Sequence, residues 1–163
     1  MSDWRERGIR VVRSGELDSS TPQTLGMHRA AAITAARTGA RQLWAGTVVI
    51  DPHALTGAHH HGPVESVIYV VSGLARMRWG EHLEYVAEAG PGDVIRVPPY
   101  VPHQEIKPGE EPLACVLVRC GAGPGRRQPR RRGRRRLART GRLDRRPAPL
   151  TPLPGAAAAI PGR

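Results

Sequence analysis

Residues 57–73 of the chain read GAHHHGPVESVIYVVSG. In an extended chain alternate side chains share a face, so His59 and His61 should point one way and His60 the other. The Gly-Pro turn that follows breaks the strand and lets Glu65 return to the side of His59 and His61. Two imidazoles and a carboxylate within seven residues form a set of ligands suited to a transition metal.

A second segment, residues 92–103, reads GDVIRVPPYVPH. A strand runs into a proline-stiffened turn, and His103 stands five residues after Pro98. A strand that returns beside the first segment would bring His103 to the metal from across the fold. A bare run of three histidines is more often a surface cluster. Glu65, the strand that follows it and this second segment together favour a metal site with His59, His61, Glu65 and His103 as ligands.

The two segments together resemble the two-part motif of the cupin superfamily. The first part is Gly, five residues, His-x-His, three or four residues, Glu, about six residues, Gly. Residues 57–73 match its histidines and glutamate, with seven residues between Glu65 and Gly73. The second part is Gly, five residues, Pro-x-Gly, two residues, His, three residues, Asn. Residues 92–107 match it, with Tyr100 in place of the second glycine and Lys107 in place of the asparagine.

This resemblance implies an all-β fold, the cupin jelly-roll β-barrel or double-stranded β-helix, holding one divalent metal ion. It also implies the activities known among cupins, which include dioxygenases, isomerases, decarboxylases and lyases, besides members without known activity. Similar single-domain cupins pair as homodimers through strand edges, and residues 9–12 are a candidate for an exchanged edge strand.

The remaining sequence agrees with a barrel, because short β-forming runs alternate with Gly- and Pro-rich turns. An alanine-rich stretch, residues 29–38, is compatible with either a helix turn or a strand. The predicted strands are residues 9–12, 42–50, 64–71, 74–79, 85–87, 94–97 and 112–118.

The charge is divided unevenly along the chain. Residues 121–163 contain 13 of the 25 basic residues and one of the 14 acidic residues, whereas residues 1–120 are near neutral. We therefore expect an N-terminal segment (1–26), a barrel (27–120) and a disordered Arg/Pro/Gly/Ala-rich tail (121–163). The tail has two interpretations: out-of-frame translation of a G+C-rich gene, or a basic arm that associates with nucleic acid.

The sequence also indicates the cellular compartment of the protein. No apolar run is long enough for a membrane span, and the charged N-terminus does not resemble a secretory signal. Two cysteines do not make a disulfide framework, so a cytoplasmic setting is the simplest interpretation.

The expected function is a small metal-dependent enzyme that acts on a small polar metabolite. Three histidines and a carboxylate can hold Fe, Mn, Ni or Zn, with positions left open for a ligand. If alternation continues after Glu65, Tyr69 faces the interior with Val67 and Val71 and is a candidate catalytic residue, although a core tyrosine is the simpler interpretation. Gln104 is a candidate substrate-binding residue at the rim. The alternative functions are a non-catalytic module that binds or senses a small molecule and nucleic-acid association through the tail.

Overall fold

The computed structural model describes residues 8–121 of the chain. These residues form a 3-10 turn, η1 (Ser14–Glu16), a one-turn helix, α1 (Ala35–Thr38), and eight β-strands. The strands are β1 (Met27–Ile33), β2 (Leu43–Ile50), β3 (Glu65–Ser72), β4 (Ala75–Trp79), β5 (Tyr85–Ala89), β6 (Val94–Val97), β7 (His103–Ile106) and β8 (Leu113–Cys120).

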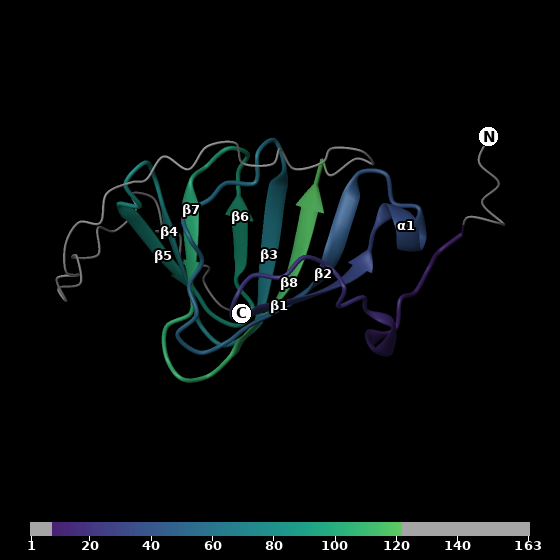
Figure 1. Cartoon of the computed structure of the whole chain (residues 1–163), viewed down its shortest axis with the longest axis horizontal. Helices are drawn as coiled ribbons and strands as arrows, with labels where there is room; N and C mark the ends of the chain where they lie inside the picture. Colours follow the sequence, from purple (N-terminus) through teal and green to yellow (C-terminus); the bar gives the residue numbers. More distant parts are fainter. Residues whose placement is uncertain (1–7, 122–163) are drawn as a thin grey trace, which may run out of the picture. The chain divides into compact units, whose positions relative to one another are not determined.

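The strands form two antiparallel sheets, a five-stranded sheet in the order β1-β2-β8-β3-β6 and a three-stranded sheet in the order β5-β4-β7 (Figure 1). The last strand, β8, lies between β2 and β3, which are its neighbours on either side. Non-sequential neighbours of this kind are typical of jelly rolls, so the predicted all-β barrel is confirmed. No helix within residues 8–121 is long and apolar enough to cross a membrane.

Six of the predicted strands are present, with ends that differ by a few residues from the expected ones. The ambiguous stretch 29–38 contains both structures: β1 ends at Ile33 and α1 follows. Thr34 caps α1 by accepting a hydrogen bond from the Arg37 amide, 3.1 Å long, and Gly39 ends it in the left-handed region. Residues 9–12 form no strand within the described part of this single chain, and Ile9 is fully exposed, so an edge strand exchanged with a second copy stays a prediction.

Side chains that face the interior form rows across the five-stranded sheet. In one row Trp44 of β2 stands opposite Arg119 of β8, which stands opposite Ser66 of β3. The rows beyond it are mainly aliphatic and supply the core, which also includes Met77 of the three-stranded sheet. The barrel therefore has one polar end, and its core fills the rest. The aliphatic rows contain Gly46, Leu117, Ile68 and Ile95, then Val48, Cys115 and Val70.

The side chains of β3 that point inward are not the predicted ones, because the inward and outward positions are shifted by one residue. Ser66, Ile68 and Val70 are the buried residues, and Tyr69 is 45% exposed on the outer face. The expectation that Tyr69 faces the interior is therefore wrong. The connection between His61 and β3 is one residue longer than the length that would place Glu65 on the inner face, so Glu65 begins the strand on the outer side.

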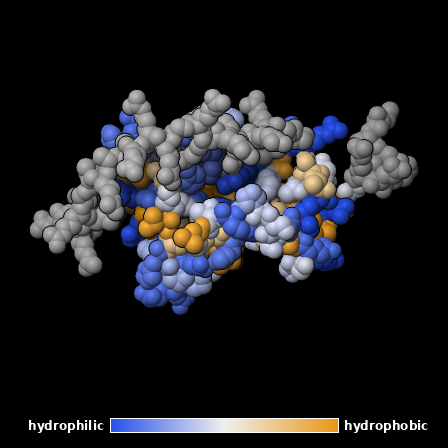
Figure 2. Space-filling view, viewed as in Figure 1, coloured by the Kyte–Doolittle hydropathy of each residue, from blue (hydrophilic) through white to orange (hydrophobic). Residues whose placement is uncertain are grey.

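The face of the molecule in Figure 2 is largely hydrophilic, with small apolar patches.

The predicted tail, residues 121–163, lies outside the described residues except for Gly121. The predicted boundaries of the N-terminal segment, the barrel and the tail stay predictions.

Candidate metal centre

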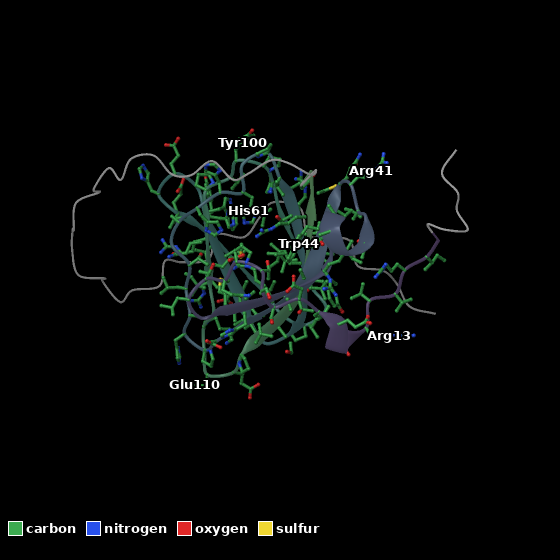
Figure 3. All side chains as sticks on the ribbon, turned by 45° about the vertical axis from the view of Figure 1, so that its right-hand side comes forward. Arg13, Arg41, Trp44, His61, Tyr100 and Glu110 are labelled. Carbon is green, nitrogen blue, oxygen red and sulfur yellow. The ribbon has the colours of Figure 1, made fainter. Side chains whose placement is uncertain are left out.

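Three histidines meet at the polar end of the barrel. His59 and His61 lie in the connection between β2 and β3, and His103 begins β7. His59 and His103 are direct antiparallel partners, because each amide donates to the other's carbonyl over 3.0 and 2.8 Å. This pairing brings together side chains 44 residues apart in the sequence. Figure 3 shows His61 and Trp44 within the barrel, with Tyr100 at the nearby rim and Glu110 at the opposite end.

The rings are held by hydrogen bonds to their Nδ1 atoms. His59 Nδ1 lies 2.9 Å from the Gly57 carbonyl and His103 Nδ1 lies 2.9 Å from the Val101 carbonyl. A carbonyl only accepts, so both rings donate from Nδ1 and keep the Nε2 lone pair. The third ring is held in a different way, because His61 Nδ1 lies 2.9 Å from Ser66 Oγ. Outer hydrogen bonds of this kind fix the orientation of metal-ligating histidines.

The residues fit a metal ion. The ligand atoms that the three histidines offer all lie within 4.8 Å of one another, and the ring centroids are 4.4 to 5.2 Å apart. His103 is almost fully buried, and its Nε2 atom has no hydrogen-bond partner among the described residues. A buried polar atom without a partner is costly, and a bound cation would use its lone pair.

The electrostatics favour neutral imidazoles, which is the form that binds metals. Burial, followed by the charges of Arg119 and of the other two histidines, lowers the pKa of His61 to about 3. Burial is also the main cause of the lowered pKa of His103, although its hydrogen bond to Val101 opposes the shift. Both rings are therefore unprotonated near neutral pH.

Glu65 does not join the three histidines in this structure. It lies on the outer side of β3, and its carboxylate forms an ion pair with Arg96 of the neighbouring strand β6. The inner position at this level of the strand belongs to Ser66, which is 0% exposed. The structure thus brings together three of the four predicted ligands and places the fourth elsewhere.

The sequence carried a signal for Ser66. The cupin motif has about six residues between its glutamate and its second glycine, whereas seven separate Glu65 from Gly73. Gly73 has a φ of 82° and packs against the backbone of Pro112, so the position of this glycine is fixed. If the six residues before Gly73 are residues 67–72, the position that the motif gives to its glutamate is occupied by Ser66. The extra residue predicts the shift in alternation that the structure contains.

Arg119 is the second residue that sequence reasoning missed. Its Nη2 atom lies 3.4 Å from His61 Nε2, and its Cζ atom lies 5.8 Å from the centre of the Trp44 ring. Burial and the charge of Arg29 lower its pKa, but an arginine stays protonated at physiological pH. Leu113, Cys115 and Leu117 face the interior, so alternation alone would have placed Arg119 there.

The turn before His103 contains the unusual Tyr100. Its φ is +60°, in the region that favours glycine, and its amide donates a 2.8 Å hydrogen bond to the Gly62 carbonyl. The ring is 63% exposed and lies 6.1 Å from that of His60, which points away from the cluster. This is the side on which alternation places His60.

Other predicted residues lie away from the three histidines. The Gln104 side chain donates a 2.7 Å hydrogen bond to the Thr56 carbonyl, and it does not line the cavity in the barrel. Met77 and Trp79 share one face of β4. On its other face Arg76 pairs with Glu88 at 2.6 Å, and Arg78 donates to the Leu83 carbonyl.

A small cavity adjoins the cluster through Arg119. About 30 Å³ of it lies within reach of the centre of a water molecule. Most of its walls are apolar, but four charged residues also line it: Arg29, Arg76, Glu105 and Arg119. Cys115 belongs to the same wall, and burial raises the pKa of its thiol to about 11, so it stays protonated.

Comparisons with known proteins agree with this description. The family model of the Cupin domain matches residues 46–119. No curated protein matches the chain.

Three solved structures illustrate the similarity. The polyketide cyclase RemF from Streptomyces resistomycificus has a TM-score of 0.60 and 20% identity, over 72% of this chain and 82% of its own. KdgF from Halomonas sp. has a TM-score of 0.56 and 18% identity, over 69% and 94%. The oxalate decarboxylase of Bacillus subtilis, which has Mn(II) centres, has a TM-score of 0.52 and 22% identity, over 60% of this chain and 26% of its own.

At these identities the likeness concerns the fold. The family match, together with the jelly-roll order of the strands and the paired segments around His59 and His103, identifies residues 46–119 as a cupin domain.

Proposed function

We propose that this protein is a metal-dependent cupin enzyme that acts on a small polar metabolite at the three-histidine centre. The observation that carries the proposal is the arrangement of the imidazoles. Each Nδ1 atom has a hydrogen-bond partner, so the Nε2 atoms of His59, His61 and His103 would hold the metal, which at His61 would replace the 3.4 Å contact with Arg119 Nη2. Three protein ligands with open positions are typical of catalytic rather than structural metal sites.

The side chains described above would bind the metal ion, and their hydrogen-bond partners would orient the imidazole rings. His59, His61 and His103 hold the ion, while Gly57, Ser66 and Val101 fix the rings through the acceptors described above. A bound Fe, Mn, Ni or Zn ion would supply Lewis acidity or a site for oxygen, depending on the metal. The aliphatic rows beneath the cluster form most of the wall of the adjoining cavity.

Two observations favour an enzyme over a non-catalytic binding or sensing module. The cavity wall contains an ionisable carboxylate, that of Glu105, on the same face of β7 as His103. A wholly aliphatic cavity would instead favour simple binding. In addition, two of the similar structures, the polyketide cyclase and the oxalate decarboxylase, are named as enzymes.

The first experiment measures metal content. Untagged wild-type protein is compared by mass spectrometry with a His59→Ala/His103→Ala double variant and with His60→Ala as the matched control. We expect about one transition metal ion per chain in the wild type and in His60→Ala, and loss of the ion in the double variant. A wild type that contains no metal, and takes up none on reconstitution, would overturn the proposal.

Once the metal is known, activity assays separate the enzyme from the sensing module. The metal-loaded protein is incubated with small oxygenated metabolites, and product formation is compared with the double variant. Ligand binding without turnover across such a panel would favour the sensing module.

A further inference from the structure

Arg119 is a charged residue that points into the interior of the barrel, where the packing of the apolar core does not require it. It extends from β8 into the interior, in the cross-strand row between Trp44 and Ser66. Its guanidinium lies between the Trp44 ring and His61 Nε2. A cation over an indole ring is held by the ring quadrupole, so the side chain is fixed in direction rather than free to reach solvent.

The guanidinium of Arg119 has no counter-ion among the residues that the structure describes. Its Nε atom is buried without a hydrogen-bond partner, and no acidic side chain within residues 8–121 forms an ion pair with it. Two other arginines of the barrel are paired, Arg76 with Glu88 and Arg96 with Glu65. A buried charge is normally paired, because its lost hydration must be replaced.

The net positive charge around the cavity also favours the binding of an anion. Arg29, Arg76, Arg119 and Glu105 line the cavity, and because Arg76 is paired with Glu88, the other three sum to one positive charge. Three neutral histidines with a divalent ion would raise this to three. The carboxylate that could have offset part of the charge, that of Glu65, faces Arg96 on the outer side.

We infer that Arg119 binds the carboxylate of a small organic acid, which makes such an acid the substrate class of this centre. The inference rests on the proposed function, because it places the acid beside the three Nε2 atoms. A guanidinium fork matches a planar carboxylate with two parallel hydrogen bonds, and the small cavity favours a short acid over a bulky anion.

This assignment predicts two effects of opposite sign when the charge is removed in Arg119→Met. The affinity for a carboxylate falls, because the charge-assisted hydrogen bonds are lost. The affinity for a divalent metal ion rises, because a positive charge next to His61 Nε2 no longer repels the ion or competes for the lone pair. General damage to the fold would lower both affinities, so the two signs identify the role of Arg119.

The experiment uses the full chain with L-lactate as the carboxylate probe. L-lactamide, which has the same shape without the charge, and inorganic phosphate are the comparison ligands. Metal content and thermal unfolding are measured first for the wild type, for Arg119→Met and for the control Arg78→Met, whose arginine donates to the Leu83 carbonyl and does not line the cavity. Ni²⁺ affinity is measured by competition with a chromophoric chelator, and ligand affinity by calorimetry on the Ni²⁺-loaded proteins.

The wild type and Arg78→Met should bind lactate at least about tenfold more tightly than lactamide, and Arg119→Met should lose this preference. Arg119→Met should also bind Ni²⁺ more tightly than the wild type, by roughly threefold to tenfold. The inference is overturned if metal-loaded wild type does not bind lactate, if lactate and lactamide bind alike, if phosphate binds as tightly as lactate, or if Arg119→Met keeps the preference. A chain that binds no metal refutes the proposed function itself, which the first measurement detects separately.

Discussion

Ser66 Oγ lies 2.9 Å from His61 Nδ1. Ser66 thus occupies the inner position of β3 where a glutamate ligand was expected, and its side chain contacts a histidine ring instead. Ser66 is fully buried on the inner face of β3, directly opposite Arg119 of β8. A hydroxyl at this position orients an imidazole instead of contributing a negative charge. The cluster therefore consists of three histidines and an adjacent arginine.

Replacing Ser66 by alanine should weaken metal binding. Without the hydroxyl, the His61 ring loses the partner that fixes its orientation, and loss of such outer contacts typically costs about 10- to 100-fold in metal affinity. The measurement is Ni²⁺ affinity by chelator competition, with Ser72→Ala, at the exposed end of β3, as the control. An unchanged affinity in Ser66→Ala would mean that His61 is held by its packing alone.

Glu65→Gln tests the remaining predicted ligand. Because the Glu65 carboxylate faces Arg96 on the outer side of the sheet, we expect the variant to keep its metal, with an affinity within about threefold of the wild type. Stability should change little, since partly exposed ion pairs contribute about 0 to 1 kcal/mol. Loss of the metal from Glu65→Gln would instead establish Glu65 as a ligand and would require a rearrangement at the start of β3.

The contrast between Glu65 and Ser66 explains how much of this molecule the sequence could predict. Strand positions and the pairing of His59 with His103 followed from local patterns, because β-forming runs and proline turns act within a few residues. The inward or outward direction of β3 depended on the exact length of the connection after His61, and one residue reversed every side chain. Tyr69 was misplaced for that reason, and Arg119 was overlooked because its strand was taken to end at Val118.

Protonation should destabilise the metal-free protein at mildly acidic pH. The pKa of His61 falls to about 3 in the fold, and that of His103 is also lowered, both mainly through burial. The unfolded state, with histidine pKa values near 6.5, then binds more protons than the folded state below that pH. By linkage this stability is fully present above pH 6.5 and is lost as the pH falls through the window toward 3.

Urea unfolding between pH 7 and pH 5 measures this effect before carboxylates protonate. Each histidine contributes a slope of at most about 1.4 kcal/mol per pH unit, and His61 contributes less because part of the ring is open to solvent. His61→Asn should flatten the dependence, whereas His60→Asn should keep the wild-type slope because His60 is exposed. Equal slopes in all three proteins would contradict the assignment to the buried rings.

Tyr100 offers a test of backbone strain at the turn that presents His103. Its φ of +60° is costly for a residue with a Cβ atom, by about 1 kcal/mol, whereas glycine adopts it freely. Because the Tyr100 ring is largely exposed, Tyr100→Gly loses little packing and should be more stable than Tyr100→Ala, which keeps the strain without the ring. The difference in free energy of unfolding between these two variants isolates the backbone contribution. If Tyr100→Ala is the more stable of the two, the turn is not strained, and the contact between the Tyr100 and His60 rings cannot account for the result because both variants lack it.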